Sequence, residues 1–304
     1  MTNDQPALSR ASTLRRVWAD LPFHCAVFGL AGLYLFLIVC LVIADARYAG
    51  FRDVYEILGD PDIQASVRLT FLTCTISALL SVLFAVPIGY VLSRRRFVGR
   101  NVIDVIVDIP IILPPLVIGL CLLILFNQIS LFGGTIEDWA AYLFGWLRLF
   151  RADVRPGVTF KVPAVILAQF TVACAFAIRT MKNTFDQIST RQEDVARTLG
   201  CSRSQTFWWV LLPQAWRGVL TGGTLAWARS LGEFGPILVF AGAVRGRTEV
   251  LSTSVFLEIN IGNLKGAAAV SLLMITLALL VIFFVRIVGE RSLFVLRRSG
   301  TYRA

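Results

Sequence analysis

Two side chains of opposite charge lie within an otherwise apolar stretch. Arg229 and Glu233 are four positions apart, so a helix would place both on one face. Ionisable groups inside a membrane-length apolar segment are costly and generally face the protein interior or a water-filled cavity. Two interpretations remain open. Either the arginine guides an anion while Glu233 holds it in place, or the two residues form an ion pair, within one helix or between helices, that locks this region.

Other residues that could do chemistry form weaker patterns. Asp104 and Asp108 could act as a carboxylate pair in acid–base catalysis, but we favour solvation of both at a membrane interface. The chain has no H-E-x-x-H motif, no G-x-S-x-G motif and no G-x-x-x-x-G-K-[ST] phosphate loop, so we expect no active site and no ATP hydrolysis by this chain. A single histidine, His24, and six cysteines without a C-x-x-C pair predict neither a metal site nor a disulfide framework.

The composition indicates which elements must position these residues. Of the 304 residues, 57% are hydrophobic and only 16% are charged. The apolar residues fall into runs of about 20, the length that a helix needs to cross a bilayer. We therefore predict an all-α integral membrane protein with six transmembrane helices. The runs cover residues 23–43, 67–92, 103–126, 162–178, 219–243 and 267–288.

The first run could belong to a signal peptide, because Ala44-Asp45-Ala46 resembles a cleavage site. A signal core has about 7–15 apolar residues, and this run is longer, so we expect an uncleaved transmembrane helix over residues 23–44.

The net charge of +10 is placed unevenly along the chain. No nucleic-acid-binding motif accompanies it, so we expect no nucleic-acid partner. Most basic residues lie in the tails, residues 1–22 and 291–304, and in two of the loops. Because basic loops stay in the cytoplasm, both termini are predicted to be cytoplasmic, and residues 127–160 form an outer loop.

Prolines interrupt three of the predicted spans. A proline inside a helix leaves a backbone carbonyl without its partner, and lipid cannot supply one. Such breaks occur where a neighbouring helix or a water-filled cavity satisfies the backbone. The sequence leaves open a pathway between the third and fifth spans or ordinary kinks in a packed bundle. The prolines are Pro87, Pro110, Pro114, Pro115 and Pro236.

The loop over residues 181–216 reads as two short amphipathic helices joined at Gly200. Ile188, Val195 and Leu199 form one predicted apolar stripe before the glycine, and Phe207, Val210 and Leu211 form another after it. Gly200 suits a left-handed turn, and Pro213 is expected to limit the second helix. Such a hairpin could transmit movement from a soluble partner to spans four and five, or it could lie on the lipid surface.

This loop resembles the E-A-A-x3-G-x9-I-x-L-P motif of ATP-binding cassette (ABC) importer permeases. The spacing is kept, with aspartate replacing glutamate and valine replacing both the first alanine and the isoleucine. In that family the loop carries a coupling helix that docks on the ATPase subunit. The resemblance therefore implies a coupling role for Gln192, Asp194, Ala196, Gly200, Leu212 and Pro213.

A second resemblance concerns the predicted third and fifth spans. Residues 227–235, W-A-R-S-L-G-E-F-G, with F-A-G at 240–242, resemble the fifth span of molybdate, tungstate and sulfate permeases. The P-x3-P-P-x3-G pattern of residues 110–119 and the R-T-E-V-L segment of residues 247–251 are similar to them as well. The resemblance covers residues 66–290, the expected permease core. It implies a translocation pathway or gate at Arg229, Ser230, Glu233, Phe234, Gly235, Pro114 and Pro115.

These resemblances imply the type I ABC importer permease fold in the inner membrane. The chain would form the path for a tetrahedral oxyanion, molybdate first, with tungstate or sulfate as alternatives. It would carry no cofactor and would work with a separate ATPase dimer that binds Mg-ATP, a second permease subunit, expected to be an identical copy, an extracytoplasmic binding protein and membrane lipid. A secondary transporter, or a permease for a different small solute, is the alternative.

Overall fold

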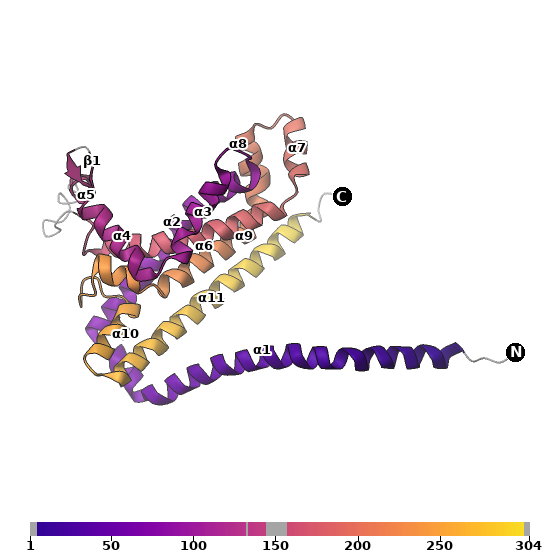
Figure 1. The fold of residues 1–304 in the computed structure, drawn as a ribbon, viewed down its shortest axis with the longest axis horizontal. Coiled ribbons are helices and arrows are strands. Elements are labelled where there is room, and N and C mark those ends of the chain that lie inside the picture. The colour runs from indigo at the N-terminus through magenta and orange to yellow at the C-terminus, as the bar shows by residue number, and fades with distance from the viewer. Residues whose placement is uncertain (1–4, 132, 144–156, 301–304) are drawn as a thin grey trace.

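The computed structural model of the protein describes residues 5–131, 133–143 and 157–300, which form a bundle of helices (Figure 1). In chain order the elements are α1 (Gln5–Leu58), α2 (Pro61–Arg94), α3 (Arg100–Ile112), α4 (Pro115–Asn127), β1 (Ser130–Leu131), β2 (Gly134–Thr135), α5 (Ile136–Leu143), α6 (Val162–Gln187), α7 (Thr190–Thr198), α8 (Arg203–Thr206), η2 (Phe207–Leu211), α9 (Leu212–Leu231), η3 (Ile237–Ala241), α10 (Leu251–Asn260) and α11 (Leu264–Gly300), where η marks a π-helix.

Four helices in the described part of the chain are long and apolar enough to cross a membrane. They are His24–Gly50 within α1, α2, α6 and Leu264–Val285 within α11. The pair α3 and α4 would supply a fifth, but the two helices are bent by 111°. The prediction of one continuous helix over residues 103–126 is therefore wrong. The cause is local: Leu113 and Pro114 each precede a proline and adopt extended backbone, with ψ of 140° and 135°.

The predicted span over residues 219–243 is also interrupted. α9 ends at Leu231, and a short non-helical stretch separates it from the π-helix η3. Gly242 then ends η3 with a φ of 71°, a conformation that favours glycine. This segment is not among the apolar spans described above, so the predicted six continuous helices are not observed as such.

α1 extends beyond the predicted first span at both ends. Gly50, with a φ of 58° and a ψ of 153°, kinks it, and a second helical segment follows as far as Leu58. Ala49 just before the kink packs on Ala268 and Ala269 near the start of α11. Residues that the apolar pattern left between spans are therefore helical. Asp60 then caps α2 by accepting a hydrogen bond from the Asp62 N–H at 2.9 Å.

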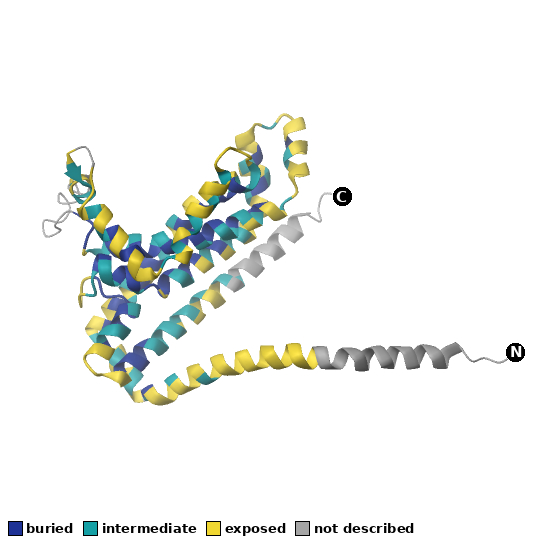
Figure 2. Ribbon diagram, in the orientation of Figure 1, coloured by how far each residue is buried: buried dark blue, intermediate teal, exposed yellow. Residues whose placement is uncertain are grey.

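Helices α2, α6 and α9 form the centre of the bundle. Their contact surfaces are built from small residues, including Ala85, Ala177 and Ala226, all fully buried. Small side chains let helix backbones approach closely. At Gly89, an added β-carbon would lie only 2.8 Å from Met181 Cβ. Figure 2 shows buried residues concentrated in this part of the molecule, while the described apolar part of α1 is almost entirely exposed.

The predicted outer loop contains the departure from an all-α fold. β1 and β2 form a two-stranded antiparallel ladder in which Ser130 pairs with Thr135. Thr135 N–H donates to Asp138 at 2.8 Å, at the start of α5. Residues 144–156, the centre of that loop, lie outside the described residues, as do residues 1–4 and 301–304 of the two predicted tails.

Candidate functional site

The hairpin around Gly200 has the predicted helix–glycine–helix form. Ser189 caps α7 by accepting from the Arg191 N–H, and Ser202 and Gln205 form a capping box at α8. Gly200 has a φ of 91°, the left-handed conformation that a β-carbon would strain. Cys201 N–H donates to the Ala196 carbonyl at 3.1 Å and closes the end of α7.

The prediction that Pro213 limits the second helix of the hairpin is wrong. α8, η2 and α9 follow one another without a break in helical backbone, and Pro213 lies in the first turn of α9. A proline is tolerated there because the π-turns of η2 precede it. The hairpin therefore continues into α9 without an interruption of the helical backbone.

In the predicted apolar stripe before Gly200, Ile188 lies outside α7, directly after α6, and Val195 and Leu199 are 50% and 80% exposed. Ala196 is instead the buried residue of α7. Gln192 and Asp194 are exposed, so α7 presents a mixed polar and apolar surface to its surroundings. The stripe after the glycine is confirmed in part, since Leu211 is fully buried.

The end of α2 holds the hairpin in place. Arg94, in its last turn, forms an ion pair with Glu193 of α7 at 2.6 Å and donates to the Ile188 carbonyl at 2.6 Å. The two charged side chains are only 9% and 16% exposed. The Tyr90 ring lies edge-on to Phe207, with 4.9 Å between centroids. Nothing in the local sequence links residues 94 and 193, and the only hint is the run of three arginines where α2 ends.

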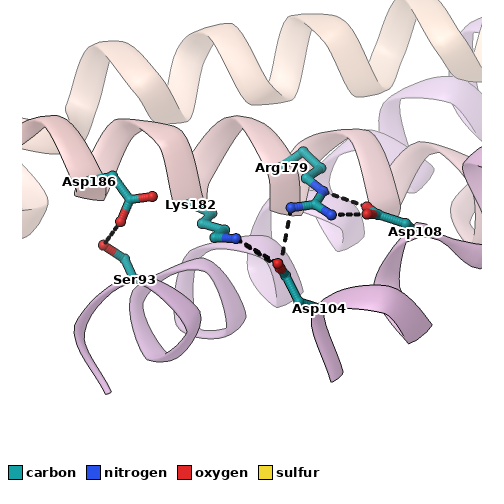
Figure 3. A network of polar contacts seen from close by, with 6 residues as sticks. All are labelled: Ser93, Asp104, Asp108, Arg179, Lys182 and Asp186. Atoms are coloured by element: carbon teal, nitrogen blue, oxygen red, sulfur yellow. Dashed lines mark hydrogen bonds and ion pairs between the residues drawn. The ribbon is translucent and has the colours of Figure 1, made fainter. Parts of the chain in front are cut away.

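A second polar network joins α3 to α6 near the same end of the bundle (Figure 3). Lys182 donates to both oxygens of Asp104, at 2.9 and 2.8 Å, and Arg179 bonds to Asp104 at 3.2 Å and also pairs with Asp108. We had expected these two aspartates to be solvated individually. They instead bind basic side chains of α6, and this anchors α3 in front of its bend.

Arg229 and Glu233 form an ion pair, as both interpretations of these residues assume. Glu233 is 1% exposed and lies just beyond α9, where its N–H donates to the Ser230 carbonyl at 3.2 Å. The Arg229 guanidinium lies over the Phe176 ring at 5.7 Å from its centroid. Ser230 is buried, and its hydroxyl has no hydrogen-bond partner among the described residues.

The two helix breaks meet each other in space. At Gly235 an added β-carbon would lie 2.9 Å from Leu116 N and from Pro115 Cβ. At Gly119 it would lie 2.8 Å from Pro236 Cα. The structure thus brings the predicted Pro114–Pro115 and Phe234–Gly235 sites together. Phe234 also packs on Phe256 of α10, with ring centroids 5.1 Å apart.

The family described as binding-protein-dependent transport system inner membrane component matches residues 85–293, a range that contains the hairpin and both helix breaks. The chain belongs to this family. The match confirms the family suggested by the loop and fifth-span motifs.

Similar permeases include the sulfate transport system permease protein CysT of Escherichia coli K12. It is 27% identical over 92% of this chain and 96% of that protein. The molybdate/tungstate transport system permease protein WtpB of Pyrococcus abyssi is 31% identical over 71% of this chain and 77% of that protein. The solved structure of a bacterial alginate ABC transporter has a similar fold, with a TM-score of 0.69 at 15% identity over 91% of this chain and 96% of the matched chain.

Proposed function

We propose that this family member is the permease subunit of an ABC importer for a tetrahedral oxyanion, with molybdate as the first candidate and tungstate or sulfate as alternatives. The fifth-span motif supports this substrate class. So do the names of similar proteins, which are sulfate and molybdate/tungstate permeases. All three anions are compact dianions, and no feature of the helices separates them.

The observation that carries the proposal is the hairpin between α6 and α9. α7 is exposed on its Gln192 and Asp194 face and is joined at both ends to membrane-length or bundle helices. A hollow of about 440 Å³ beside Gly200 is lined by Asp194 and Arg197. We propose that α7 docks on an ATPase subunit that binds Mg-ATP, and that its displacement is carried into α6 and α9.

The translocation path in this proposal runs beside the two meeting helix breaks. Irregular backbone at membrane depth requires protein or water around it. Here each broken segment is packed against the other, because Gly235 lies close to Pro115. We propose six crossings, of which α3–α4 and α9–η3 are the broken ones. Both termini and the hairpin would then be cytoplasmic. A second copy of the chain would complete the path, and a binding protein would deliver the anion to the outer end.

The test is trace uptake of molybdenum, tungsten and sulfur in the cells of origin, with the chain deleted and then restored. Uptake of one oxyanion should fall on deletion, return with the wild-type chain, and stop when ATP is depleted. The Gly200→Val variant should be present in the membrane at the wild-type level but should not restore uptake. Uptake that persists without ATP would favour a secondary transporter, and unchanged uptake of all three anions would refute the substrate class.

A further inference from the structure

A cavity of about 350 Å³ lies beside Ser66, Arg68, Arg247 and Glu249. The start of α2 and the segment before α10, which carry these residues, are at the end of the bundle opposite the hairpin (Figure 1). The cavity lies between the first turns of α2, which contribute Ser66 and Arg68, and the segment after η3, which contributes Arg247 and Glu249. These two segments are far apart in the sequence, so only the fold assembles the site. We refer to it as the outer-end cavity. The coupling and helix-break sites described above use none of its residues.

Two arginines without partners line the outer-end cavity. Arg68 and Arg247 are exposed, and neither forms an ion pair with any residue that the structure describes. Their neighbour Arg245, by contrast, is paired with Glu258 of α10. A guanidinium presents several donors in a planar fork that matches the oxygens of an oxyanion. Two unpaired guanidinium groups at one cavity would repel a cation and favour an anion.

Glu249 is the unusual member of the cavity wall. It is 2% exposed, and neither of its carboxyl oxygens has a hydrogen-bond partner by geometry among the described residues. Burial raises the pKa of Glu249, and the carboxylates of Asp62 and Glu258 act in the same direction, while Ser254 and Arg245 oppose them. Both oxygens of Glu249 are buried, so the carboxyl lies behind the cavity wall and does not bond a ligand in the cavity. A raised pKa favours the neutral form of the carboxyl, which repels a nearby anion less than a carboxylate does.

We infer that the outer-end cavity receives a tetrahedral oxyanion, with the guanidinium groups of Arg68 and Arg247 binding its negative charge. The inference rests on the proposed import of oxyanions and adds a place where the anion first meets the permease. The cavity lies at the end where a binding protein would release its ligand. An acidic segment of that binding protein is a different occupant, and the experiment below separates the two.

The experiment measures binding of molybdate, tungstate and sulfate to the purified permease–ATPase complex in nanodiscs, without binding protein, by isothermal titration calorimetry. Arg68→Gln and Arg247→Gln should each weaken binding by about tenfold or more, because each removes a charge-assisted contact. Glu249→Gln should stay within about threefold of wild type, because both oxygens of this side chain are buried behind the cavity wall. Lys265→Gln, an exposed basic residue outside the cavity, is the matched control.

Several results would overturn the inference. No detectable anion binding by the wild-type complex would do so, and intact ATP-driven uptake by the same complex in proteoliposomes supplied with binding protein would leave the proposed function standing. Unchanged binding in both arginine variants would place the anion elsewhere. If the arginine variants bind the anion as wild type does but their ATPase activity is no longer stimulated by the binding protein, the cavity would be assigned to an acidic segment of that partner.

Discussion

The contact between Arg94 and Glu193 leads to a test of how α7 is coupled to the bundle. If α7 receives the push of an ATPase, this pair extends the push to α2, which packs along both α6 and α9. Arg94→Ala or Glu193→Ala should therefore leave the complex assembled but lower the number of anions imported per ATP hydrolysed.

The magnitude follows from the geometry of the pair. The 2.6 Å separation and the low exposure of both side chains place it between a surface pair and a buried one. Surface pairs contribute about 0–1 kcal/mol, and breaking a buried pair costs about 3–5 kcal/mol, so we take about 2 kcal/mol here. About 1.4 kcal/mol corresponds to a factor of ten in an equilibrium constant. The ratio of molecules with α7 held against α2 to molecules with α7 released should therefore fall by about 30-fold.

The assay is ATP-driven uptake together with ATPase activity in proteoliposomes that contain the complete importer. The exchanged pair, Arg94→Glu with Glu193→Arg, should transport better than either single charge reversal. Recovery should be partial, because the exchange does not restore the bond from Arg94 to the Ile188 carbonyl. If the effects of the two single reversals simply add in the double variant, the pair is uncoupled and the reasoning is refuted.

Three further predictions concern the packing and backbone of the same machinery. Gly235→Ala should destabilise the protein by about 1–3 kcal/mol and lower its thermal midpoint in detergent, because the new β-carbon meets α4. Gly232→Ala is the control and should have little effect, because its β-carbon would meet only the Arg229 carbonyl, at 3.9 Å. Gly200→Val should strain the left-handed turn by about 1–2 kcal/mol and reduce uptake per ATP, and Gly200→Asn should be milder because asparagine tolerates this conformation; equal uptake by wild type and the valine variant would contradict the coupling role. Arg179→Gln should change the thermal midpoint by only a few degrees, since its partly exposed pairs are each worth about 0–1 kcal/mol, and a loss of folding would contradict that estimate.

Several features of the protein follow from the sequence alone. Apolar runs of membrane length predicted helices at α2, α6 and α11, because hydropathy and helix length are properties of a continuous segment. The position of Gly200 predicted the turn after α7, because few residues other than glycine adopt that backbone conformation. The loop and fifth-span motifs identified the family, because their residues are close together in the chain.

Other features were decided by tertiary structure. The sequence showed prolines at residues 114 and 115 but not that they meet Gly235, and it predicted an exposed pair of aspartates where Arg179 and Lys182 bind them. The stripe containing Val195 and Leu199 is exposed in the fold, whereas Leu211 of the second stripe is fully buried. Helical periodicity states which residues share a face, but the neighbouring helix decides whether that face is covered.

The physical reason is the distance along the chain between partners. Arg94 and Glu193 form their ion pair only after the helices have packed, so no local pattern contains it. Arg68 and Glu249 likewise come to line one cavity only through packing. The sequence therefore determined the membrane class, the hairpin and the family. The packing of the helices alone determined which charges are paired, and which are left available to a ligand.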